Sequence, residues 1–293
     1  MPDRSAVAVT VLTLILLWDV AGDAIAQPLA HDRAMPGQAT GSSEAFVVDV
    51  RGSTAERPAN TLYRAPLAAF TSQTSIGPTQ SRILAMDFSI AGVLHGVTAS
   101  FASTNPSTLG AIDLSTGAFT PIGPLAGLAT GEEPHGLAID ARSGVAYLAT
   151  SDGAESTLHT LNLATGAAAV VGSITLFPDN IDIGALAIGC DGVLYGFERL
   201  SDSLLSIDRT TGAATKLGFS GYSPTGASMD FDNASGALYG WLALGQGLVA
   251  FGVFNRTTGG FTPLANGPDG QYEGAVRSAC PPELPLFANG FEG

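Results

Sequence analysis

The sequence predicts an all-β chain that folds as a five-bladed β-propeller, closed by one blade shared between its two ends. Two phrases recur about every 47 residues, which is the length of one four-stranded propeller blade. The segments between turn residues are short and apolar, and no segment after residue 26 shows helical periodicity. Three strand-like segments precede the first complete repeat and one follows the last, so together they supply a fifth blade.

The first repeated phrase places an aspartate or asparagine three residues before a Thr-Gly pair. The pairs stand 49, 46 and 47 residues apart and end at Gly117, Gly166, Gly212 and Gly259. An Asx side chain accepts hydrogen bonds from the backbone just after it, and glycine adopts the positive φ that a tight turn needs. The phrase therefore predicts a hairpin turn, followed by a strand that ends near a second glycine such as Gly123.

The second repeated phrase is an apolar strand followed by a turn and a returning strand, as in Leu84–Asp87 with Val93–Gly96. It predicts that Asp87, Asp140 and Asp230 share one position in their blades. Asp113 and Asp208 share another, where Asn162 and Asn255 replace them. Because asparagine keeps the hydrogen-bonding geometry and loses the charge, we interpret these repeated aspartates as turn residues rather than acids or bases.

The repeats divide the chain into four complete blades, at about residues 83–123, 134–172, 184–218 and 226–265. The leftover strands are expected at Ala45–Val50, Thr61–Ala65, Leu67–Ile76 and Tyr272–Arg277. A ring closed by both chain ends removes the edge strands that an open array exposes. We therefore expect the propeller to occupy residues 45–280.

The ends of the chain lie outside this ring. Residues 1–26 have the features of a signal peptide: Arg4, a short apolar run, and Ala24-Ile25-Ala26 before Gln27. A buried N-terminal helix is the alternative. Residues 27–44 are expected to form a flexible lead, and residues 281–293 a C-terminal tail that leaves the last strand through prolines. We therefore expect a secreted or periplasmic protein with no membrane span.

The composition excludes several classes of partner. The chain has 12 basic and 26 acidic residues, so nothing supplies the positive surface that nucleic acid requires. The four histidines form no metal-ligand spacing, and no nucleophile elbow or phosphate-binding glycine loop occurs. We expect no cofactor and no metal site.

Cys190 and Cys280 are the only two cysteines. Each closely follows the innermost strand of a predicted blade, so both are expected on one face of the ring. An exported protein permits a disulfide, and a short tail crossing the channel mouth would bring them together. Two buried free thiols are the alternative.

The combined repeat, best seen over residues 109–147, resembles secreted bacterial β-propeller domains of unassigned function. The resemblance covers about residues 45–280 and implies a propeller and an exported protein. It brings no catalytic residues with it, because the shared positions are turn and core residues. The ending Leu286–Glu292 is similar to the short F-x-x-G-F-E tails of many exported proteins of Gram-negative bacteria.

The loops that lead into the innermost strands differ between blades, and a propeller presents such loops around one channel mouth. They carry carboxylates, a histidine, arginines and tyrosines. The candidate binding residues are Arg82, Glu133, His135, Asp182, Glu198, Tyr222, Tyr272 and Glu273, with Arg199 beside them. Solvated loops without function are the alternative.

Three functions fit these observations. We favour an exported, non-catalytic propeller that binds an unknown small molecule, glycan or protein at its channel mouth. A glycosidase-like hydrolase is the competing hypothesis, with Glu133, Asp182 and Glu273 as its carboxylates. A ring that serves only as a spacer is the third. The only tryptophan after residue 26, Trp241, occupies a strand position that suggests core packing rather than sugar stacking.

Overall fold

The structure is a computed structural model, and it describes residues 43–52, 55–99, 106–176, 181–245, 247–268 and 270–282. The predicted signal peptide, most of the predicted lead and the end of the predicted tail lie outside these residues. The described part contains 20 strands and one short 3-10 helix. None of its helices is long and apolar enough to cross a bilayer.

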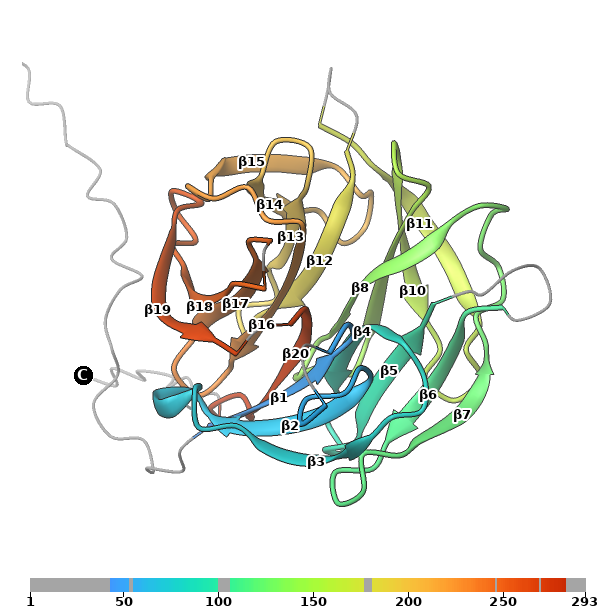
Figure 1. Cartoon of the computed structure of the whole chain (residues 1–293). Coiled ribbons are helices and arrows are strands. Elements are labelled where there is room, and N and C mark those ends of the chain that lie inside the picture. The colour runs from blue at the N-terminus through green and yellow to red at the C-terminus, as the bar shows by residue number, and fades with distance from the viewer. Residues whose placement is uncertain are drawn as a thin grey trace, which may run out of the picture. The chain divides into compact units, whose positions relative to one another are not determined.

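The strands form five antiparallel four-stranded sheets, which are the blades of a β-propeller (Figure 1). The bounds of the strands, blade by blade, are as follows. Blade 1 contains β4 (Ile83–Phe88), β5 (Leu94–Thr98), β6 (Thr108–Ile112) and β7 (Phe119–Pro124). Blade 2 contains β8 (Glu133–Ile139), β9 (Ala146–Ser151), β10 (Ser156–Leu161) and β11 (Ala168–Ile174). Blade 3 contains β12 (Ile183–Ile188), β13 (Leu194–Glu198), β14 (Ser203–Ile207) and β15 (Ala214–Phe219). Blade 4 contains β16 (Gly226–Asp232), β17 (Ala237–Ala243), β18 (Val249–Phe254) and β19 (Phe261–Gly267). The closing blade contains β20 (Tyr272–Arg277), β1 (Glu44–Asp49), β2 (Thr61–Pro66) and β3 (Thr74–Pro78).

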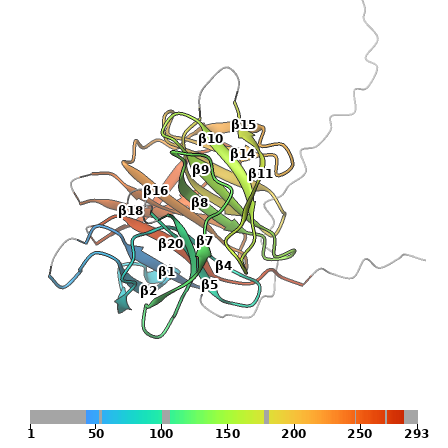
Figure 2. The same ribbon diagram turned by 90° about the vertical axis from the view of Figure 1, so that its right-hand side faces the viewer.

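The predicted ring and its closure are confirmed. The innermost strands β4, β8, β12, β16 and β20 surround the centre, and each contacts the next, including β20 with β4 (Figures 1 and 2). Strand β20 pairs antiparallel with β1, from Glu44 opposite Arg277 to Asp49 opposite Tyr272. The last strand of the chain therefore completes the sheet begun by the first three, as the leftover strands predicted.

One predicted strand of the closing blade is wrong in part. The segment Leu67–Ile76 was expected to be continuous, but residues Leu67–Ala69 form a 3-10 turn and β3 begins only at Thr74. Pro66 has no backbone N–H to continue a ladder. Phe70 leaves the sheet to stack on Phe251 of blade 4, with ring centroids 4.2 Å apart. The closing blade therefore has a 3-10 turn and a buried aromatic ring where the other blades have a tight hairpin turn.

The core consists of five clusters, each lying between two neighbouring blades. Alternate residues of each strand face opposite neighbours, so one blade contributes side chains to two clusters. Trp241 is 1% exposed and packs between blade 4 and the closing blade, which confirms its predicted role in the core.

The repeated glycines are explained by contact between blades. Gly172 lies in the outer strand β11 of blade 2, and a Cβ built on it would overlap the carbonyl oxygen of Thr211 in the Thr-Gly turn of blade 3. The same contact recurs at Gly77, Gly123 and Gly218. Ala265 stands at this position in blade 4, where the closing blade has the 3-10 turn and Phe70 instead of a Thr-Gly turn. The glycine is therefore required only where a turn approaches.

Candidate functional site

The ring has two faces, which we name by the direction of the innermost strands. The upstream face is where these strands begin, and the downstream face is where they end. The predicted binding residues belong to the upstream face. A cavity of about 670 Å³ lies at the downstream face.

The Asx side chains of the Thr-Gly turns accept hydrogen bonds from their own turns. Asp113 accepts hydrogen bonds from the backbone N–H groups of Ser115 and Thr116, at 2.8 and 2.9 Å. These bonds and one from the Ser115 hydroxyl lower the pKa of Asp113 to about 2. Asn255 accepts the equivalent backbone bonds in blade 4. Charge is therefore dispensable at this position.

The other group of aspartates divides into two kinds, which corrects the prediction that Asp87, Asp140 and Asp230 are equivalent. Asp87 pairs with His95 across its sheet and Asp230 with Tyr239, whereas Asp140 lies beyond the last paired residue of β8. The side chain of Asp140 accepts hydrogen bonds from Arg142 and Ser143 of its own turn. The three aspartates align in sequence because the repeated phrases look alike. The turns that follow them differ in length between blades, so only the cross-strand pairing register distinguishes Asp140 from Asp87 and Asp230.

Asp87 and Asp230 each join two blades. Asp87 accepts hydrogen bonds from the backbone N–H groups of Phe88 and of Ile139 on β8, both at 2.6 Å. Asp230 accepts the equivalent bonds from Phe231 at 2.7 Å and from Val276 on β20 at 2.6 Å. An innermost strand has no further strand to receive its N–H groups, so the carboxylates satisfy amides that face the channel.

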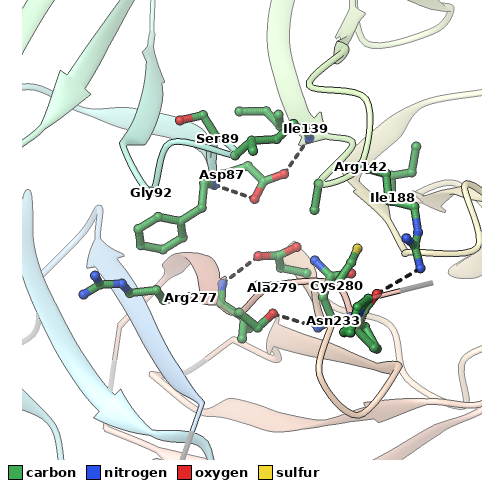
Figure 3. A pocket seen from close by; sticks show the side chains of 18 residues that line it. Asp87, Ser89, Gly92, Ile139, Arg142, Ile188, Asn233, Arg277, Ala279 and Cys280 are labelled. Atoms are coloured by element: carbon green, nitrogen blue, oxygen red, sulfur yellow. Dashed lines mark hydrogen bonds between the residues drawn. The ribbon is translucent and has the colours of Figure 1, made fainter. Parts of the chain in front are cut away.

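The downstream cavity has a volume of about 670 Å³ and contains both of these carboxyl groups in its lining (Figure 3). The ends of the innermost strands surround it: Phe88, Ile139, Ile188 and Arg277 are the last residues of β4, β8, β12 and β20. Cavities of this size hold small ligands in other proteins.

Burial dominates the electrostatics of the cavity. Asp87 is 7% exposed and Asp230 6% exposed. Burial raises the pKa of Asp87 well above its usual value, and the charge of Asp230 raises it further. Burial raises the pKa of Asp230 to about 7, although hydrogen bonds from Val276 and Phe231 oppose the shift. Perturbed carboxyl groups in a cavity are a common mark of functional sites.

The segment 278–282, which we call the strap, forms one wall of this cavity. The predicted disulfide is confirmed: Cys190 and Cys280 are bonded, with Cα atoms 5.6 Å apart. Arg142 donates hydrogen bonds to the carbonyl oxygens of Cys190 at 2.9 Å and Pro281 at 3.3 Å. The Ser278 hydroxyl accepts a bond from the backbone N–H of Asn233 at 2.7 Å. The strap is therefore tied to blades 2, 3 and 4.

On the upstream face, the structure brings together five of the eight predicted residues. His135 of β8 lies within electrostatic range of Arg82, Glu133 and Asp182, and also of Arg199. Glu273 of β20 is within range of Arg82 and Arg199. Four blades contribute to this group of ionisable side chains.

Arg199 interacts with Asp182, His135 and Glu273 of the upstream group. Its guanidinium donates two hydrogen bonds to Asp182, from Nε at 3.0 Å and from an Nη atom at 2.7 Å. Its side chain lies against Gly184, where a Cβ would come within 2.7 Å of Cδ. The Ser151 hydroxyl donates a further bond to Asp182 at 2.8 Å. The sequence placed Arg199 on this face, and Ser151 carried no signal in the repeat.

The remaining three predicted residues have structural contacts. Glu198 is 2% exposed and accepts hydrogen bonds from the turn residues Leu200 and Ser201. The ring of Tyr222 packs edge-on against Phe261. Tyr272 is 2% exposed, and its hydroxyl donates to the carbonyl of Pro268 at 2.6 Å.

The channel is narrow below the upstream group. A cavity of about 10 Å³, the space of a single water, lies beside His135 and Glu273. Burial and the nearby charge of Arg199 lower the pKa of His135 to about 4, so this imidazole is neutral at pH 7. Burial raises the pKa of Glu273 well above its usual value. Burial therefore disfavours the charged form of both groups.

No group of three or more metal-ligating side chains occurs among the residues that the structure describes.

The sequence does not point to the downstream cavity, because Asp87 and Asp230 stand in a repeated phrase whose aspartates predict turns. One signal was available. Both cysteines follow innermost strands, so a disulfide between them carries the chain across the downstream mouth. A segment that crosses the mouth forms one wall of a cavity there.

Comparison with solved structures agrees with the propeller fold. A chain of the nidogen/laminin complex is 12% identical, with a TM-score of 0.53 over 81% of this chain and all of that one. TolB from Acinetobacter baumannii is also 12% identical, with a TM-score of 0.48 over 80% of this chain and 66% of that one. A putative 6-phosphogluconolactonase from Bacteroides uniformis is 12% identical, with a TM-score of 0.46 over 78% of this chain and 84% of that one.

Of these three, the nidogen/laminin chain alone has a TM-score above 0.5, and that likeness concerns the fold alone. No protein-family model and no curated protein matches the sequence. The chain is a five-bladed β-propeller.

Proposed function

We propose that this chain is an exported binding protein that holds a small ligand in the cavity at the downstream mouth of its channel. The observation that carries the proposal is the cavity of about 670 Å³, which two buried carboxyl groups and the disulfide-held strap enclose. Ligand sites in rigid folds combine mostly apolar walls with a few convergent polar groups. This cavity brings the two carboxyl groups together with apolar side chains from the strand ends and with other polar residues such as Asn233 and Ser278.

A disulfide supports a location outside the reducing cytoplasm, such as the periplasm or the extracellular space. The signal peptide predicted at residues 1–26 agrees with this location and stays a prediction.

The hydrolase hypothesis receives less support from the geometry. A glycosidase needs two carboxyl groups with space between them for a sugar ring. Asp182 is engaged by Arg199 and Ser151, and the cavity beside Glu273 holds about one water. Retention of full activity by Glu273→Gln, if hydrolysis of a glycan were detected, would exclude that residue from the mechanism.

The experiment for the binding proposal is thermal unfolding against mono- and oligosaccharides, amino acids, amines, peptides and Ca²⁺. A ligand at 100 times its Kd adds about 2.7 kcal/mol to the free energy of unfolding, which is a visible shift. Ala279→Trp narrows the downstream cavity. Ala129→Trp is the matched control, because Ala129 is exposed and lies in the loop before β8 on the other face.

We expect the wild type and Ala129→Trp to respond to the same probe and Ala279→Trp not to respond. An undiminished response of Ala279→Trp would place the ligand elsewhere. If neither the wild type nor either variant shows a thermal shift with any probe in the panel, the proposal that the cavity binds a small ligand is wrong.

A further inference from the structure

The two carboxyl groups of the downstream cavity lack a cationic partner among the described residues. No ion pair there involves Asp87 or Asp230, in contrast to Asp140, which pairs with Arg209 at 3.1 Å. Each of the two carboxyl groups accepts two backbone hydrogen bonds, which occupy about half of the acceptor sites of a carboxylate. Each carboxylate can therefore accept further hydrogen bonds, and a buried carboxylate is stabilised most by a positively charged donor.

Apolar side chains form part of the wall around the carboxyl groups. Phe88, Ile139, Ile188 and Val276 line the cavity from the four surrounding strand ends, and Pro281 lines it from the strap. Figure 3 shows the Asp87 carboxylate across the cavity from Ala279 and Cys280. A ligand that matches this lining has a charged donor at one end and a hydrocarbon body behind it.

We propose that the downstream cavity binds a primary alkylammonium group, with Asp87 and Asp230 as its counter-ions and the strand-end side chains around its carbon chain. This inference rests on the proposed function and adds the chemical class of the ligand. A free aliphatic amine and a lysine side chain of a partner share this chemistry.

The other charged groups around the cavity limit what binds. Arg142 is engaged by the carbonyl oxygens of the strap and of Cys190. Arg277 is exposed at the rim and disfavours a second positive charge there. The site therefore suits a single ammonium group better than a polyamine.

Two further titratable side chains face the aspartates across their sheets. His95 lies opposite Asp87, and burial lowers its pKa, which disfavours a positive charge on its ring. Tyr239 lies opposite Asp230, and burial raises its pKa. Asp232 adds negative potential at Asp230. None of these groups neutralises the pair.

Binding of a cation is therefore expected to be linked to proton release. Burial raises the pKa of both carboxyl groups in the free protein, so bound protons compete with an ammonium ion for the pair. Affinity for an amine should rise about tenfold between pH 5 and 8, and affinity for a neutral ligand should not change.

The test is calorimetric titration of the whole protein with n-butylammonium, n-butanol and butyrate. Each titration is run at pH 7 in two buffers of different ionisation enthalpy. We expect n-butylammonium to bind at least tenfold more tightly than the other two probes, with an enthalpy that depends on the buffer. A lysine-containing peptide and its norleucine analogue, titrated in parallel, distinguish a partner's side chain from a free amine.

Variants provide a second readout. Asp230→Asn should weaken n-butylammonium at least tenfold. Asp208→Asn removes the same charge from a turn where asparagine occurs naturally in other blades, and should bind as the wild type does. Should Asp230→Asn fail to fold, Arg277→Gln at the exposed rim serves instead, with affinity expected to rise two- to fivefold at low salt.

Two failures are distinguishable. If n-butanol, butyrate or a saccharide binds in the cavity and n-butylammonium does not, the ammonium inference is wrong and the proposed function stands. If nothing binds, both are wrong. Equal amine binding by Asp230→Asn and Asp208→Asn would also overturn the inference.

Discussion

Replacement of Gly172 by alanine tests whether close contact between blades explains the repeated glycines. Gly172 has ordinary backbone angles, so alanine introduces no conformational strain. The new methyl group would instead overlap the carbonyl oxygen of Thr211 and lie 3.2 Å from its carbon. Both contacting groups are backbone, so no side chain can rotate to relieve the overlap.

The expected effect follows from two opposing terms. Overpacking in a well-packed region costs typically 1–3 kcal/mol. Alanine regains about 0.4–1 kcal/mol by restricting the unfolded chain. A net loss of about 1–2 kcal/mol lowers the Tm of a domain of this size by roughly 2–8 °C.

Gly260→Ala is the matched control. A Cβ there meets only the Thr258 hydroxyl at 3.5 Å, an ordinary contact, and the backbone angles are again ordinary. This variant should match or slightly exceed the wild-type Tm. The assay is differential scanning calorimetry of the oxidised protein, checked by urea unfolding. A Gly172→Ala variant at least as stable as Gly260→Ala would refute the explanation.

Three further predictions concern charge and covalent structure. Because the pKa of Asp230 is raised from 3.8 to about 7, the folded state holds its proton where the unfolded state has lost it, so this group costs stability as pH rises from about 4 to 7, by up to about 4 kcal/mol. Urea unfolding between pH 4.5 and 7.5 checks this, and a flat profile would contradict it. Reduction of the Cys190–Cys280 bond, which spans 90 residues, should lower the free energy of unfolding by up to about 4 kcal/mol. An unchanged urea midpoint in reductant would disprove that contribution. Arg199→Gln removes the partner of Asp182, whose side chain is 9% exposed, and should cost about 2–3 kcal/mol in the same assay. A loss below 0.5 kcal/mol would show that solvent already screens the pair.

Most of the fold was predictable from the sequence because a propeller repeats its turns. The Thr-Gly phrase recurs at a constant spacing, and each copy carries its own turn chemistry. Closure was predictable because the leftover strands before and after the repeats add up to one blade. The break at Leu67–Ala69 was not predictable, since it depends on where Phe70 finds aromatic partners in blade 4.

The candidate site was predictable on one face only. Variable loops pointed to the upstream group, and the structure brings Arg82, His135 and Glu273 into electrostatic range of Arg199. Tyr272 was expected beside them, but it packs between blades. A strand end exposes one residue to the channel and the next to the core, and a one-residue difference in register decides which.

The blade count, the closure and the partners in the disulfide follow from the sequence alone, because each depends on local turn chemistry and on simple counting along the chain. The sharing of one cavity by Asp87 and Asp230, and the absence of Asp140 from it, become visible only in the folded ring. Their environment depends on cross-strand register and on neighbours from other blades. Burial, and with it the protonation of a carboxyl group, is a property of the assembled ring.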